Sequence, residues 1–174
     1  MKRALIVLAF TAFLAAGAAT FAFASKGSST YGLVEARLAT ARFQSIDAAT
    51  AAGYAELRDA HKIACIADPQ GGMGVHYVNQ KLVGDARIDP RHPEALVYAP
   101  QHGTMRLGAL EYIVFAKAWK KTAPPQLFGR TFDYVPAGNR YGLPPFYELH
   151  AWLWQHNPSG MFEDWNPRVT CAFA

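Results

Sequence analysis

The spacing of apolar residues divides the chain into a helical N-terminal part and a longer β part. Residues 31–60 are rich in Ala and Leu, lack Pro, and place Val34, Leu38 and Ala41 three or four residues apart. This period predicts an amphipathic helix whose apolar side covers a sheet. Ser45 has a side chain that commonly caps the N-terminus of a helix. The pattern therefore predicts either one kinked helix or two short helices.

Four later segments are predicted to be β-strands. Each is rich in residues that favour strands, and turns containing Gly or Pro separate one from the next. The segments are residues 73–79, 94–98, 105–115 and 146–154. The sequence thus predicts a single α+β domain, with an N-terminal helix or helix pair packed on a curved, mainly antiparallel β-sheet or a small β-barrel. Residues 25–64 are expected to be helical and residues 65–174 mainly β.

The first residues have the pattern of a signal peptide. Two basic residues are followed by a long uncharged apolar run, and residues 22–24, Ala-Phe-Ala, fit the small-x-small cleavage pattern. We therefore expect residues 1–24 to be removed after Ala24 and residues 25–174 to be periplasmic or secreted, with no stable membrane span after cleavage. The alternative is an uncleaved membrane anchor, because the apolar run approaches the roughly 20 residues that span a bilayer.

The composition favours a folded domain and excludes one class of partner. The chain is 51% hydrophobic, which is more apolar than a disordered chain. Its formal net charge is +4, and removal of the two basic residues in the signal segment lowers this to +2. Because the basic residues do not gather in one stretch, nucleic-acid binding is not expected. A small molecule or a metal ion is the expected partner, and the sequence does not define an oligomeric state.

The chain contains two cysteines, Cys65 and Cys171. An even number of cysteines in an exported chain is typical of disulfide bonding, because that compartment is oxidising. A metal-thiolate site would instead require closely spaced cysteines, as in CxxC, and these two are far apart in the sequence. We therefore expect a Cys65–Cys171 disulfide that ties the end of the helical region to the C-terminal region.

Polar residues interrupt each predicted strand. Glu111 lies in a segment that is apolar on both faces, so the segment is predicted to be a central strand with Glu111 buried. A buried carboxylate costs several kcal/mol unless it is paired, hydrogen-bonded, metal-bound or protonated. His76, Glu94 and His150 lie in the other three segments and are the candidate partners. Residues on neighbouring strands, which lie about 4.8 Å apart, can converge when they point to the same side.

These four residues predict a metal site. Imidazole and carboxylate suit zinc, iron, manganese or copper, and two His with one carboxylate is the ligand set of non-haem iron(II) sites. The predicted ligands are therefore His76, Glu94, Glu111 and His150, with Glu111 as the anchoring carboxylate. In an enzyme, the ion would act as a Lewis acid or an oxygen-activating centre on a small organic substrate. Two alternatives remain open, namely a metal-free His/Glu network lining a ligand pocket and a purely structural network.

Aromatic residues in the same segments supply a second functional hypothesis. The predicted pocket-lining residues are Tyr77, Tyr98, Tyr112, Trp152, Trp154 and His156. Aromatic walls are typical of pockets for apolar or aromatic ligands, although they also form ordinary cores. They favour a non-catalytic small-molecule binding protein of the cell envelope, and an envelope interaction module without a pocket is a third option. Familiar hydrolase, kinase and dehydrogenase motifs are absent from the sequence, so no reaction is predicted.

Four sequence stretches carry a family resemblance. They are GMGVHYVN at residues 72–79, PEALVY at 93–98, LEYIV at 110–114 and LHAWLWQHNPSGMF at 149–162. In these the chain resembles a family of small exported bacterial proteins, over nearly all of the expected mature chain. The resemblance implies export and no particular activity. A looser similarity is to cupins, which place His and Glu on barrel strands around a metal, but the close His-x-His pair of cupins is missing.

Overall fold

The structure is a computed structural model that describes residues 20–101 and 103–172, with side chains from residue 29 onward. Residues 1–19 of the predicted signal peptide therefore lie outside the described residues, and its last five residues begin helix α1. The helical elements are α1 (Thr20–Thr40), the 3-10 helix η1 (Ala41–Gln44), α2 (Ile46–Ala51) and α3 (Gln80–Val83). Across the described residues, no helix has both the length and the hydropathy needed to cross a bilayer.

Most of the strands form one antiparallel sheet. The strands are β1 (Ala55–Glu56), β2 (Cys65–Asp68), β3 (Gly71–Val78), β4 (Ala95–Gln101), β5 (Thr104–Phe115), β6 (Gln126–Leu127), β7 (Arg130–Thr131), β8 (Asp133–Val135) and β9 (Phe146–Ala151). The sheet order is β1-β3-β4-β5-β9-β8, with β2 also paired to β3, while β6 and β7 form a separate pair. The α+β prediction is confirmed. The barrel alternative is wrong, because the short edge strands β1 and β8 do not pair with each other.

The helical region is two helices joined by a 3-10 turn, and it is shorter than predicted. Ser45 caps α2, since its hydroxyl accepts a hydrogen bond from Ala48 N at 3.4 Å. The helices end at Ala51, whereas the sequence predicted helix over residues 25–64. Gly53 follows with a positive φ of 94°, a conformation that ends a helix readily because glycine has no Cβ. The chain then joins the sheet edge as β1.

Helix α1 packs on the sheet through small residues rather than through its larger apolar ones. Val34 and Leu38, predicted to face the sheet, are 50% and 73% exposed. The buried face instead carries Gly32 and Ala36, which are four residues apart, and Ala36 is fully buried. A Cβ on Gly32 would lie 3.2 Å from the Phe128 ring, so the helix backbone closely approaches its neighbour. The sequence predicted the helical period correctly, but it assigned the wrong side of α1 to the contact with the sheet.

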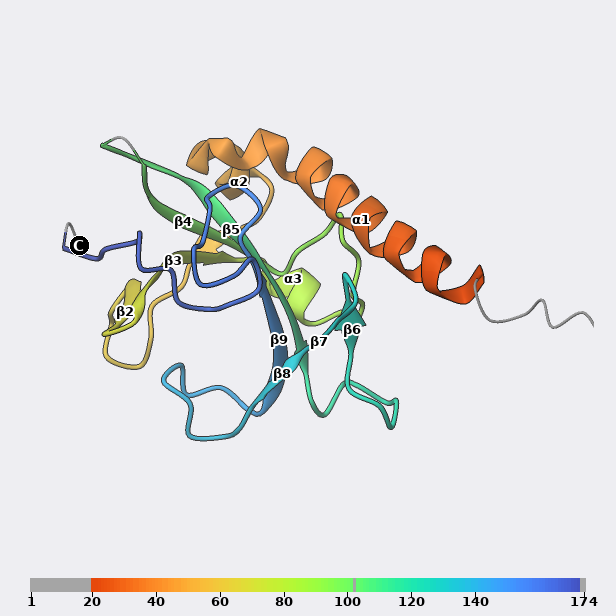
Figure 1. Ribbon diagram of the computed structural model, residues 1–174. Coiled ribbons are helices and arrows are strands. Elements are labelled where there is room, and N and C mark those ends of the chain that lie inside the picture. Colours follow the sequence, from red (N-terminus) through yellow and green to blue (C-terminus); the bar gives the residue numbers. More distant parts are fainter. Residues whose placement is uncertain (1–19, 102, 173–174) are drawn as a thin grey trace, which may run out of the picture.

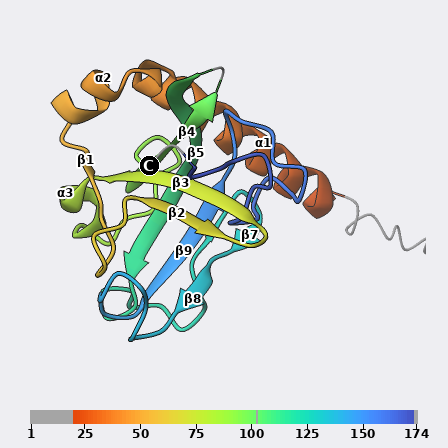
Figure 2. The same ribbon diagram turned by 90° about the vertical axis from the view of Figure 1, so that its left-hand side faces the viewer.

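The two faces of the sheet have different covers. Helices α1 and α2 lie along one side of the strands (Figures 1 and 2). The main core on this helix-covered face includes Phe43, Tyr54, Leu96, Tyr98, Leu107, Leu110, Tyr112 and Leu149. A smaller cluster, which lies on the opposite face, consists of Val97, Ala99, Ala109, Trp152 and Val169. Since its last two members follow β9, residues 152–172 cover part of this second face, and we call them the C-terminal cover.

A disulfide and a β-bridge hold the C-terminal cover in place. The predicted bond between Cys65 and Cys171 is present and connects β2 to the end of the cover. Gly72 and Asn166 form an antiparallel bridge, with both N–O distances 3.1 Å. A Cβ on Gly72 would lie 2.7 Å from the Val169 side chain, so this contact requires glycine. The cover is therefore fastened to the same end of the sheet at two points.

Candidate functional site

Glu111 lies in the middle of the sheet, on the face opposite helices α1 and α2. Its strand, β5, has β4 on one side and β9 on the other, and Glu111 stands opposite Ala95 and His150 in the two registers. The side chain is buried, with the residue only 4% exposed. The prediction that Glu111 is buried in a central strand is confirmed. Its direct neighbour on β9 is a histidine, which is one of the predicted partners.

His76 reaches Glu111 across strand β4. It stands opposite Val97, on the side of the sheet that also carries Ala95 and Glu111. Because the intervening Ala95 is small, the imidazole and the carboxyl group meet above it. The distance from His76 Nε2 to Glu111 Oε2 is 3.5 Å. This is too long to be a good hydrogen bond, so it is a close contact only.

The path of strand β3 near His76 depends on Gly74. This glycine has a φ of +103°, and β3 shifts its register against β2 next to it. A Cβ at this position would lie 2.5 Å from Tyr98 O in β4, closer than any real contact. Only glycine therefore lets β3 approach β4 here. Since His76 follows two residues later, Gly74 contributes to the position of the imidazole.

His150 lies between His76 and an aromatic ring from the C-terminal cover. The ring centroids of His76 and His150 are 6.2 Å apart, and those of His150 and Trp152 are 5.0 Å apart. Trp152 is fixed in turn, because its Nε1 donates to Glu163 O at 2.7 Å. The C-terminal cover thus positions His150 through a ring contact.

The two imidazoles are buried without hydrogen-bond partners. His76 and His150 are each 2% exposed, and none of their four ring nitrogens has a partner among the described residues. Burial lowers the pKa of His76 to about 4 and the pKa of His150 to about 3. Both rings are therefore neutral at neutral pH, so each has a nitrogen lone pair to offer. An unsatisfied buried polar group costs about 1–3 kcal/mol, so this arrangement needs an explanation.

A second carboxyl group, Glu148, adjoins Glu111. It lies two residues before His150 on β9, and its side chain is hydrogen-bonded to that of Glu111. Burial raises the pKa of Glu111 well above its usual range, and the negative charge of Glu148 adds to this effect. Burial also raises the pKa of Glu148. The pair therefore shares a proton, with Glu111 as the donor and Glu148 as the acceptor.

Glu94 is buried elsewhere. It precedes Ala95, so strand alternation directs it to the helix-covered face, away from His76 and Glu111. Its Oε2 accepts a hydrogen bond from Ile113 N at 3.0 Å. Burial raises the pKa of Glu94 to about 8. The structure thus brings together three of the four predicted ligands, and Glu94 is not among them.

The predicted pocket tyrosines belong to the helix-covered core. Tyr98 donates its hydroxyl hydrogen to Phe43 O at 2.7 Å, and Tyr112 donates to Pro90 O at 2.8 Å. The ring of Tyr77 contacts Tyr98, with centroids 5.1 Å apart. These hydroxyl groups therefore fasten helices and loops to the sheet, on the face opposite Glu111.

The remaining predicted pocket residues are divided between the two faces. Trp152 contacts His150, as described above. Trp154 instead donates from Nε1 to Thr40 Oγ1 in α1 at 3.2 Å, and it lies beneath the Arg37 guanidinium. His156 is exposed on the C-terminal cover. Of the predicted aromatic wall, only Trp152 contacts the buried His and Glu group.

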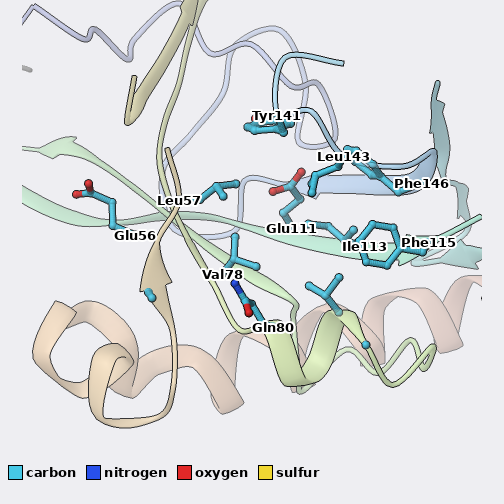
Figure 3. Close-up of a pocket in the computed structure, with 13 residues that line it drawn as sticks. Glu56, Leu57, Val78, Gln80, Glu111, Ile113, Phe115, Tyr141, Leu143 and Phe146 are labelled. Carbon is cyan, nitrogen blue, oxygen red and sulfur yellow. The ribbon is translucent and has the colours of Figure 1, made fainter. Parts of the chain in front are cut away.

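A cavity of about 360 Å³ adjoins Glu111 (Figure 3). Its lining is Ala55, Glu56, Leu57, Val78, Gln80, Val83, Gly84, Glu111, Ile113, Phe115, Tyr141, Leu143 and Phe146. In Figure 3 the Glu111 carboxyl group lies among Leu57, Tyr141 and Leu143. A sequence pattern does not reveal this cavity, because its walls come from the β1 region, α3, β5 and the connection before β9.

A second, more polar cavity of about 280 Å³ lies beside the first. Its lining includes Glu148 and Asp164, and burial raises the pKa of Asp164 to about 6. Tyr141 and Phe146 line both cavities and so form part of the wall between them. The two hydrogen-bonded carboxyl groups therefore open to different cavities, Glu111 to the apolar one and Glu148 to the polar one.

The fold and the site define an α+β protein with an open, curved sheet and a buried imidazole and carboxyl group beside an apolar cavity. Comparison with protein-family models, with curated proteins and with solved structures finds no match. Within residues 29–101 and 103–172, no three His, Cys, Asp or Glu side chains already stand at the spacing that holds a metal ion. The functional argument therefore rests on the chemistry of the side chains themselves.

Proposed function

We propose that the protein binds a divalent transition metal ion through His76, Glu111 and His150. The observation that carries this proposal is that four ring nitrogens are buried without a partner beside a buried carboxyl group. One cation would provide a partner for both rings and would stabilise the ionised form of Glu111. The ion would take one nitrogen of each ring as a ligand, a partner that none of the described side chains provides.

The donor set supports zinc, iron, manganese or copper. Two imidazoles and one carboxylate suit these ions, whereas calcium and magnesium prefer oxygen donors alone. Two imidazoles on one tetrahedral ion, with bonds of about 2.0–2.1 Å, place their ring centroids roughly 5 Å apart. The present separation is 6.2 Å. Binding thus requires the rings of His76 and His150 to approach each other by about 1 Å.

The neighbours of the three ligands have supporting roles. Glu148 is hydrogen-bonded to Glu111, and such outer partners orient a ligand and tune its basicity. Trp152 holds the ring of His150. Binding would release the proton that the two carboxyl groups share, so affinity would rise with pH. Three protein ligands leave open positions on the ion, which suits a Lewis-acid or oxygen-activating centre acting on a small organic substrate.

The proposal includes export from the cytoplasm. The N-terminal pattern of a signal peptide and the Cys65–Cys171 disulfide both support a periplasmic or secreted location, because disulfides persist in oxidising compartments. There the protein would load its ion from the surroundings. Peptide mapping of the mature N-terminus tests cleavage after Ala24.

Metal analysis tests the central proposal. Purified protein is stripped with a chelator, incubated with zinc, iron(II), manganese or copper in turn, desalted and analysed for bound metal. We expect about one ion per chain for the preferred metal. His76→Ala and Glu111→Gln should each weaken binding at least about tenfold.

Glu94→Gln is the matched control. It replaces a buried carboxyl group on the other face of the same sheet, so it should leave the metal content unchanged. Substoichiometric metal in the wild-type protein would contradict the proposal. So would equal binding by wild type, His76→Ala and Glu111→Gln.

A further inference from the structure

The cavity beside Glu111 has walls that suit an apolar molecule. Its apolar lining comes from separate segments, with side chains from Leu57, Val78, Val83, Ile113, Phe115, Leu143 and Phe146. The inner polar group is Glu111, which is buried, while Gln80 and Glu56 lie toward the outside. In Figure 3, Leu57 and Leu143 lie beside the Glu111 carboxyl group, and Ile113, Phe115 and Phe146 extend to one side of it. Pockets of this kind bind through their apolar walls and orient the ligand through a few polar groups.

The charges around the cavity disfavour an anionic ligand. No Lys, Arg or His is among its lining residues. The carboxyl group of Glu56 points away from the cavity in Figure 3 and pairs with Arg58 at 2.7 Å. A buried anion would thus have no cation to compensate it, which is strongly unfavourable. The ligand is therefore expected to be uncharged.

The cavity volume limits the size of the ligand. An engineered apolar cavity of about 150 Å³ binds one benzene molecule. The present cavity, of about 360 Å³, has a little more than twice that volume. It therefore accommodates a compound of about two rings.

We infer that this cavity is the binding site for an uncharged apolar molecule of about two rings, with one polar atom directed at Glu111. The binding itself depends only on the cavity. With an ion bound through Glu111, the molecule in the cavity would also lie next to that ion. This second part of the inference rests on the proposed function. Tyr141, which is also in the cavity wall, is a second group within reach of the polar atom.

Two fluorescent probes with the same ring system test the ligand class. 1-Naphthylamine is uncharged, and 5-amino-1-naphthalenesulfonate carries a sulfonate on the same two-ring skeleton. Each is titrated into metal-free protein while its fluorescence is recorded. We expect the uncharged probe to bind at least about tenfold more tightly, because the sulfonate has no counter-charge in the cavity.

Cavity-filling variants test the location of the bound probe. Leu57 and Leu143 lie on different segments and line the first cavity but not the second, so Leu57→Trp and Leu143→Trp should each weaken binding of the uncharged probe at least about tenfold. Val135 lines the second cavity but not the first, so Val135→Trp is the matched control, with no change expected. Thermal unfolding of each variant identifies any that is misfolded. If one blocking variant misfolds, the other still tests where the probe binds.

The outcomes separate this inference from the metal proposal. Probe binding that the blocking variants abolish supports the inference whether or not metal binds. A protein that binds metal but not the uncharged probe overturns the inference and leaves the metal centre intact. Equal affinity for the two probes, or an unchanged affinity in both blocking variants, also overturns it.

Discussion

Glu94 and Glu111 are both buried carboxyl groups, yet they meet different partners. Strand alternation directs Glu94 to the helix-covered face, where Ile113 N donates to it. Glu111 points to the other face and contacts His76. The same residue type is therefore satisfied by the backbone in one place and left beside unpaired imidazoles in the other. This difference makes Glu94 a good reference for experiments on Glu111.

The raised pKa of Glu94 predicts a pH dependence of stability. Its usual value of 4.5 is raised to about 8 in the folded protein. Below pH 4.5 Glu94 is protonated in both the folded and the unfolded protein, so its burial does not lower the unfolding free energy through ionisation. Between pH 4.5 and 8 the unfolded state ionises first, so stability falls as the pH rises. Above pH 8 Glu94 is ionised in both states, and the unfolding free energy falls no further on its account.

Glu94→Gln should remove this part of the pH dependence. Urea unfolding at pH 5 and pH 9 measures the loss of unfolding free energy for each protein. We expect the loss to be larger in the wild type, by on the order of 3 kcal/mol, because Gln cannot ionise. The other buried carboxyl groups are common to both proteins and cancel in the comparison. Equal losses would show that Glu94 is ionised without penalty in the folded state.

Single residues in the site were predictable to the extent that they broke an apolar pattern. His76, Glu111 and His150 are polar residues in apolar strands, and this identified them. The face that Glu94 occupies was not predictable, because it depends on the register of its strand against β5. Glu148 could have been found, since it lies two residues before His150 and shares its face. Tyr141, in an irregular loop, has no such pattern.

At the scale of elements, the close contact between β3 and β4 depends on Gly74. We expect Gly74→Ala to lower the unfolding free energy by more than about 2 kcal/mol, because the new Cβ would clash with Tyr98 O and the positive φ adds strain. Urea unfolding measures this change. Because His76 follows on the same strand, bound metal should fall as well.

Gly138→Ala is the matched control for this prediction. Gly138 has a positive φ of 82°, but nothing lies within 4 Å of its Cβ position. Its substitution should cost only about 1–2 kcal/mol, which is the backbone strain alone. Similar decreases in unfolding free energy for Gly74→Ala and Gly138→Ala would mean that the close approach of β3 to Tyr98 O does not make residue 74 require glycine.

The positions of the main strands were predicted well. The sequence did not decide between an open sheet and a closed barrel. Strong apolar segments gave β3, β4, β5 and β9 close to their observed positions. Closure depends instead on edge strands, and β1 and β8 are too short for a sequence pattern to reveal. The side of α1 that faces the sheet was also missed, because packing through Gly32 and Ala36 leaves the larger apolar residues outside.

At the scale of the whole molecule, the Cys65–Cys171 bond should contribute strongly to stability. It joins residues 106 positions apart, and the chain-entropy model assigns about 4–5 kcal/mol to such a closure as an upper value. The double substitution to Ser should therefore lower the unfolding free energy by up to this amount in urea. A change below about 1 kcal/mol would mean that the bridge to Gly72 alone suffices to hold the C-terminal cover.

The C-terminal cover also gives the order of events during maturation. Cys171 follows every strand of the described sheet, so its bond with Cys65 closes only after the sheet residues have emerged and met an oxidant. Until then the disulfide does not restrain the C-terminal cover. Under the proposed metal binding, an ion at His150 would exchange more readily before this bond forms than after it. The compartment in which the thiols are oxidised, as much as the ligand chemistry, would then determine which ion the protein retains.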